Sequence, residues 1–389
     1  MSAQTTKLRF LLRSLWQSPL FGDSFPPMDE QAFLLQFQSM VPAFVEKLVP
    51  VLRVGLPDAT DEEIDDLVGQ LTPKSLAFCA AIAAGEVEDT ERLLQAALIM
   101  ALVYWVDQSM DRGDEMMLLA VQRMEHSGSF DLPVPALSRW NVLQHMQALI
   151  RQVVQDPQDA PYAMQAILEV LKAEARMREF SKNLQGSQHP EKFWQIYSQE
   201  VVKNSILSGL MTVTTLIYSL YHQSYPSLPS LSEALSCPIL TRLIDTTLNA
   251  AVRVFDDAGD WKIDAGLHRG WGIFTINLFN QANETFYAQF LESSGLKPED
   301  QFYRQTEDAF HQPLATRRVA VVKIYVELVR HQVVSIPESV YKKYEIFLTV
   351  LRRVMEAALV TMAGDIFLAE TSLFEAIDSE ISHFILPNG

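Results

Sequence analysis

The sequence predicts an all-α protein, built as a single large helical bundle around a central cavity. Apolar residues recur at the three- and four-residue spacing of amphipathic helices through most of the 389 residues, and no segment alternates as a strand would. Turns rich in proline or glycine separate these segments, and neither an internal repeat nor a linker divides the chain. We therefore expect a lead-in segment over residues 1–28 and one helical domain over 29–389.

Local signals indicate where the helices begin and end. Pro42 lies inside the first of them, so we expect that helix to be kinked or split. Thr60 is a candidate N-cap, Pro73 suits the first turn of a helix that Gly85 would end, and Pro238 could interrupt a later helix. The predicted helices span about 29–52, 61–71, 73–84, 87–111, 138–155, 160–184, 189–223, 231–264, 273–293, 298–309, 316–333 and 337–384.

Charge and composition exclude some classes of function. The formal net charge is -17, and no stripe of lysine and arginine is present to bind a phosphate backbone, so we expect no nucleic-acid partner. Cys79 and Cys237 lie far apart without metal-ligand spacing, and no apolar run followed by a cleavage signal is found near residue 1. A reducing, cytoplasmic location fits these features best.

Two segments raise the question of a membrane. Residues 1–28 predict a short amphipathic helix with an irregular lead-in, which either lies on a membrane surface or packs across the domain. The uncharged stretch 204–221 is long enough to span a bilayer, but it carries many serine and threonine side chains. Such a helix is better suited to a central position beside a cavity, so we expect no transmembrane segment.

A dense row of acidic residues follows the apolar stretch 239–254. In a helix, residues four apart lie one turn above each other, so Asp256, Asp260 and Asp264 project their carboxylates to one side. Like charges at this spacing destabilise a helix by about 0.2–0.5 kcal/mol per pair. Solvent, basic partners or a divalent cation must offset this repulsion, and we favour the cation.

A second acidic face ends the predicted helix 87–111. Asp107 and Asp111 lie one turn apart there, and Asp114 would follow on nearly the same stripe if the helix continued past Gly113. Carboxylates without histidine or cysteine ligands select hard cations, and Mg2+ is typically held by one or two carboxylates together with water and substrate phosphates. The two faces therefore predict an Mg2+ site, which Mn2+ could also occupy, with a diphosphate as the third partner.

The residues around both faces resemble the motifs of one enzyme superfamily. The run 255–264 resembles the second aspartate-rich motif of the class I isoprenoid synthases, which include trans-prenyltransferases and terpene synthases. The run 107–112 is similar to a variant first motif of Asp-x-x-x-Asp form, as in large bacterial terpene synthases. The 149 residues from 107 to 256 match the family's spacing, and the resemblance covers roughly residues 70–290.

The resemblance implies a function and a role for each matching residue. It implies Mg2+-dependent ionisation of a prenyl diphosphate and conversion of the allylic cation to a terpene, with three metal ions and, by family analogy, a homodimer. Asp107, Asp111, Asp256 and Asp260 would hold the ions, with Asp257 or Asp264 in support. The diphosphate and the prenyl chain would contact Lys203, Arg112, Arg253, His268, Arg269, Phe78, Tyr104 and Phe255.

Three departures from the family pattern bear on the reaction type. Val106 replaces the first acid of a full Asp-Asp-x-x-Asp motif, and the basic motif that chain-elongating enzymes use near their N-terminal helices is missing. Asn277, Gln281 and Thr285 keep the spacing of the metal triad of ordinary terpene cyclases but lack its terminal acid. A single-substrate cyclase or lyase is therefore favoured over chain elongation.

Other interpretations of the same residues remain open. The run 260–270 also resembles the acidic segment of squalene and phytoene synthases, which condense two prenyl diphosphates. Each acidic row could instead be a helix end exposed to solvent. The aromatic side chains could pack in the core, and His268 could have a structural role. In that case the protein would be a non-catalytic helical scaffold.

Overall fold

The computed structural model describes most of the chain and confirms the all-α fold. It describes residues 20, 25, 30–83, 86–87, 89–111, 114–127, 138–156, 158–184, 208–225, 227–264, 277–279 and 284–367. Every regular element in these ranges is helical. In chain order they are α2 (Glu30–Gly55), α3 (Asp61–Thr72), η2 (Pro73–Ala77), α4 (Phe78–Ala83), α5 (Thr90–Asp111), α6 (Glu115–Ser127), α7 (Ser138–Val153), α8 (Ala160–Leu184), α10 (Ser208–Ser224), α11 (Leu231–Leu235), α12 (Pro238–Leu243), η4 (Ile244–Leu248), α13 (Asn249–Asp264), α14 (Glu284–Ser293), α15 (Gln301–Phe310), α16 (Leu314–Val334), α17 (Glu338–Lys343) and α18 (Glu345–Phe367).

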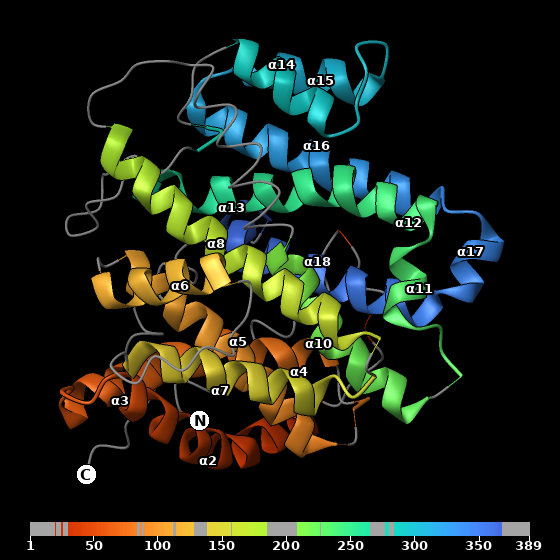
Figure 1. The fold of residues 1–389 in the computed structure, drawn as a ribbon. Helices are drawn as coiled ribbons and strands as arrows, with labels where there is room; N and C mark the ends of the chain where they lie inside the picture. Colours follow the sequence, from red (N-terminus) through yellow and green to blue (C-terminus); the bar gives the residue numbers. More distant parts are fainter. Residues whose placement is uncertain are drawn as a thin grey trace.

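The helices form two groups joined by a central pair (Figure 1). The N-terminal group contains α2, α5 and α7, which pack against one another, and α8 packs against α5 and α7. The C-terminal group contains α13, α15 and α16, with α16 between the other two. Helices α10 and α18 pack against each other and connect the groups, because α10 contacts α8 and α5 while α18 contacts α13 and α4.

Several predicted elements are confirmed by these bounds. Helix α8 spans 160–184 as expected, and Thr60 caps α3, since its Oγ1 accepts from the Glu63 amide at 3.2 Å while Glu63 Oε2 accepts from the Thr60 amide at 2.8 Å. Pro238 begins a new helix, α12. Of the two alternatives for the first helix, the split one is wrong, because α2 runs through both Pro42 and Pro50 while its buried face packs on α5 and α7.

The condition for placing Asp114 on the acidic stripe of the preceding helix is not met, and one further helix begins later than expected. Helix α5 ends at Asp111, and a separate helix, α6, begins at Glu115. Asp114 lies between them and is a helix cap, because its Oδ1 accepts from the Met117 amide at 3.0 Å and its Oδ2 pairs with Arg139 at 2.8 Å. The helix expected over 273–293 begins only at Glu284.

The described part of the lead-in segment packs on the domain. Leu20 and Phe25 are both buried, and the guanidinium of Arg353 on α18 lies 5.5 Å from the centre of the Phe25 ring. These contacts favour the packed alternative for this segment. Among the described helices none is long and apolar enough to cross a membrane.

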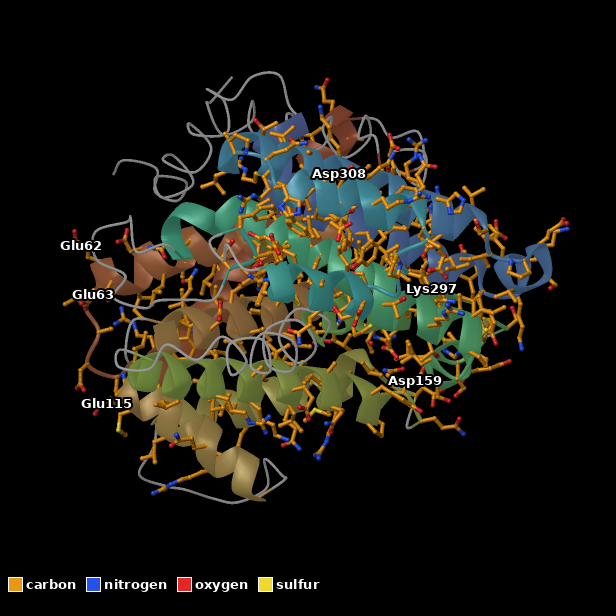
Figure 2. All side chains as sticks on the ribbon, turned by 90° about the horizontal axis from the view of Figure 1, so that it is seen from above. Glu62, Glu63, Glu115, Asp159, Lys297 and Asp308 are labelled. Carbon is orange, nitrogen blue, oxygen red and sulfur yellow. The ribbon has the colours of Figure 1, made fainter. Side chains whose placement is uncertain are left out.

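Asp159 ties the start of α8 to the start of α11. It is buried, and its two carboxylate oxygens accept from the backbone amides of Leu231 and Ser232 at 3.1 and 3.2 Å. Figure 2 places it at one end of the molecule, far from Glu115 at the start of α6. A carboxylate at this position satisfies amides that a helix start leaves without partners.

A polar cluster of Glu86, Tyr221 and Arg353 joins the segment that follows α4 to α10 and α18. Glu86 Oε2 accepts from the Tyr221 hydroxyl at 2.7 Å and from Arg353 at 2.8 Å, and the Tyr221 hydroxyl also lies 2.8 Å from Arg353. Partial burial opposes ionisation of Glu86, but the hydrogen bonds from Arg353 and Tyr221 outweigh it and lower the pKa of this carboxyl. The cluster therefore stabilises the fold while Glu86 is ionised.

We expect the contribution of Glu86 to stability to depend on pH. Because its pKa is lower in the folded protein than the ordinary value of 4.5, the contribution is complete above that value and is lost as pH falls through the folded pKa. Glu86→Gln should therefore reduce the free energy of unfolding more at pH 7 than at about pH 4. Urea unfolding of both proteins at the two pH values tests this, and an equal loss at both would contradict it.

Candidate functional site

The first acidic face lies at the end of α5. Tyr104 and Asp107 are three residues apart, so they share one side of this helix, and both are partly exposed. Trp105, the next residue, is buried and points elsewhere in the core. The side chain of Asp111, one turn further, lies outside the described residues.

The second acidic face lies on α13. Asp256 is partly exposed, with 22% of its side chain accessible, whereas the neighbouring Asp257 is completely buried. Arg253, one turn earlier, is also buried and forms ion pairs with both, through Nη1 to Asp256 Oδ2 at 3.0 Å and through Nη2 to Asp257 Oδ1. Asp256 is therefore the member of this pair that faces out of the core.

Acids of both faces influence the pKa of Tyr104. Burial, together with the neighbouring Cys79 and the carboxylates of Asp107 and Asp256, raises the pKa of the Tyr104 hydroxyl. Two acids that lie 149 residues apart in the sequence (107 to 256) thus act on one phenol. In Figure 1, α13 ends on the same side of the molecule as α6, which follows α5.

The donor chemistry at this place suits a hard cation. Burial raises the pKa of the Cys79 thiol to about 12, so Cys79 stays protonated and is a poor metal ligand. The remaining donors are carboxylate and phenol oxygens, which Mg2+ and Mn2+ prefer. No group of three or more candidate ligands gathers among the described side chains, which do not include those of Asp111, Asp260 and Asp264.

Asp257 holds the turn that follows the motif. Its Oδ2 accepts from the Leu278 amide at 2.7 Å, and its backbone carbonyl accepts from Nδ2 of Asn277 at 2.8 Å. Asn277 is itself buried, and its Oδ1 accepts from the Phe279 amide at 2.9 Å. These bonds explain why no helix forms at 277–279, and they give Asn277 a structural role.

Gly259 allows α13 to approach α18 closely. A Cβ atom built at this position would collide with the backbone carbonyl of Met362, which precedes the kink in α18 at Ala363. Close packing of α13 against α18 therefore explains why a glycine occupies this position of the acidic motif. It also sets the distance between α18 and the helix that carries Asp256.

The other predicted site residues fall into two groups. Phe78 is partly exposed at the start of α4 and packs against the core, while Phe255 is completely buried beside Asp256. Lys203, Arg112, His268 and Arg269 lie outside the described residues.

Sequence reasoning ranked Arg253 only by its closeness to the motif and assigned it to the substrate. Its spacing of three and four residues from Asp256 and Asp257 is the signal that could have identified the ion pairs. The bonds between Asp257 and the 277–279 turn had no such signal, because they join segments about twenty residues apart.

Comparison with known proteins supports the fold alone. No family model matches the chain, and no curated protein matches it. Among solved structures it is similar to a mutant of the SVS_A2 protein from ancestral sequence reconstruction, with a TM-score of 0.50 and 12% sequence identity over 84% of this chain and 85% of that one. At this identity the similarity shows that the two chains share an all-α architecture.

Proposed function

We propose that this protein is a class I terpene synthase, which ionises a prenyl diphosphate with Mg2+ and converts the allylic cation to a terpene. The proposal is supported by the partly exposed carboxylate of Asp256, which Arg253 holds at 3.0 Å, and by the influence of both Asp107 and Asp256 on the pKa of the Tyr104 hydroxyl. Asp107 lies in the C-terminal part of α5, and Asp256 lies in the middle of α13 after an apolar stretch. The all-α fold is compatible with this proposal.

The metal ions would be held by carboxylates of the two helices. Asp107 and Asp111 would contribute from α5, and Asp256 and Asp260 from α13 with Asp264 in support. When bound, Mg2+ supplies Lewis-acid stabilisation of the negative charge on the departing diphosphate. Asp257 has protein partners for its carboxylate, which suits it to a supporting role.

The chain's own residues would perform the remaining tasks. Lys203, Arg112, His268 and Arg269 would bind the diphosphate and balance the acidic surroundings. The Tyr104 hydroxyl has a raised pKa, so it stays protonated and can donate a hydrogen bond to an anionic oxygen nearby. Aromatic faces such as that of Phe78 would stabilise the carbocation, and the apolar helices would exclude water.

The proposal is tested with purified protein, Mg2+ and a series of prenyl diphosphates that includes farnesyl, geranylgeranyl and longer chains. We expect Mg2+-dependent pyrophosphate release together with a hydrocarbon or terpene alcohol, identified by mass spectrometry. A product with a doubled chain would instead indicate condensation, as in squalene and phytoene synthases. Absence of turnover with every chain length, in Mg2+ and in Mn2+, would support a non-catalytic scaffold and overturn the proposal.

A further inference from the structure

The ion pairs inside the α13 motif have no part in the function proposed so far. Arg253 is 3% exposed and lies between two carboxylates, of which one faces outward and the other is completely buried. Burying a charged group is costly unless it is paired and hydrogen-bonded. Of these three residues, Arg253 and Asp257 are buried, and only Asp256 has an accessible side chain.

Asp257 is fixed from more than one direction. It is paired with Arg253 through Oδ1, and its Oδ2 accepts from the Leu278 amide, while Asn277 bonds its backbone carbonyl. Both carboxylate oxygens are therefore turned toward protein groups. Because Asp257 cannot rotate without losing these partners, the guanidinium of Arg253 has a fixed anchor.

The fixed guanidinium in turn determines how Asp256 is presented. Nη1 of Arg253 binds Oδ2 of Asp256 at 3.0 Å, so a cation approaching this carboxylate would meet Oδ1 first. A carboxylate held by one oxygen loses the rotamer freedom that it would otherwise give up on binding a metal. The turn at 277–279 is thereby linked to the orientation of Asp256 by a chain of contacts: the turn binds Asp257, Asp257 pairs with Arg253, and Arg253 pairs with Asp256.

We propose that Arg253 and Asp257 are positioning residues, which hold the Asp256 carboxylate in the orientation that receives a divalent cation. This inference rests on the proposed function, because it assumes that Asp256 binds the metal. It assigns to Arg253 a role other than contact with the diphosphate. Groups that orient metal ligands typically change metal affinity 10–100-fold when they are replaced.

The experiment measures Mn2+ binding directly, by the electron paramagnetic resonance signal of free Mn2+ in the presence of inorganic pyrophosphate. The main variant is Arg253→Gln combined with Asp257→Asn. It removes one positive and one negative charge, so the formal charge of the three-residue cluster stays at about -1, and any change in affinity reports orientation more than net charge. We expect Mn2+ binding to weaken about 10–100-fold.

Asp159→Asn is the matched control. Asp159 is also a buried aspartate whose oxygens accept from two backbone amides, but it lies beside α11, away from the acidic ends of α5 and α13 (Figure 2). We expect this variant to lose stability to urea and to keep its Mn2+ affinity. Comparing the two variants separates the positioning role from a loss of fold stability.

A second variant applies where the double substitution does not fold. Arg253→Lys keeps the positive charge, but its single ammonium cannot bridge two carboxylates as a guanidinium does. We expect it to weaken Mn2+ binding about tenfold. Asp256→Asn, measured in the same way, establishes how much affinity the ligand itself contributes.

The outcomes distinguish the inference from the function on which it rests. If the unsubstituted protein bound no Mn2+ with pyrophosphate, the proposed function would be wrong and the inference with it. If Asp256→Asn weakened binding while the double variant and Arg253→Lys bound Mn2+ as well as Asp159→Asn does, the metal site would stand and the positioning role would be overturned.

Discussion

Replacing both Asp256 and Asp260 with asparagine is expected to reduce Mg2+-dependent pyrophosphate release by about 10³-fold. The exchange keeps the shape of each side chain but removes its charge, so the metal ions that stabilise the departing diphosphate lose their anionic ligands on α13. Such stabilisation is worth several kcal/mol, and roughly 4 kcal/mol corresponds to about 10³ in rate. The measurement is single-turnover release of pyrophosphate from a prenyl diphosphate at saturating Mg2+.

Asp308→Asn is the control for this double substitution. Asp308, which Figure 2 labels, is an exposed acid on α15, a helix that packs on α14 and α16, so its exchange removes a negative charge without changing the core. Its turnover should equal that of the unsubstituted protein. If the Asp256 and Asp260 double variant kept full turnover as well, the assignment of the α13 carboxylates to the metal would be incorrect.

The fold could be predicted largely because its signals are local. The bounds of α8 follow from apolar spacing and turns, and the cap of α3 follows from Thr60 and Glu63. The same kind of signal was present at Asp114 but was interpreted as part of an acidic stripe, so α6 was missed. The turn at 277–279 could not be predicted, since Asp257 and Asn277 meet only in the folded chain.

The sequence indicates which residues are candidates for the site, but not how they lie relative to one another in the folded chain. Helical spacing identified the carboxylates of α5 and α13, but no local signal indicates that Asp107 and Asp256 act on the same tyrosine. That meeting depends on how α18 and α10 space the two halves of the bundle. Likewise, the burial of Arg253 and its ion pairs with Asp256 and Asp257 depend on tertiary packing, which closeness to the motif in the sequence does not indicate.

Gly259→Ala is expected to lower the free energy of unfolding by about 2 kcal/mol or more. Overpacking typically costs about 1–3 kcal/mol, and here the added Cβ would meet the backbone carbonyl of Met362, which cannot move aside as a flexible side chain can. The higher helix propensity of alanine offsets only about 1 kcal/mol of this cost. The urea midpoint and slope of the two proteins measure the difference.

Gly209→Ala gives the matched comparison, because it makes the same chemical change where a Cβ would meet nothing within 4 Å. This variant should be as stable as the unsubstituted protein or gain roughly 0.4–1 kcal/mol, since alanine restricts the unfolded chain. In Gly259→Ala the only relief is for α13 and α18 to separate, which displaces Asp256, and misplacement by about 1 Å can cost 10²-fold in rate. We therefore expect turnover to fall in Gly259→Ala alone, and equal stability of the two variants would mean that the close approach of α13 and α18 is not required.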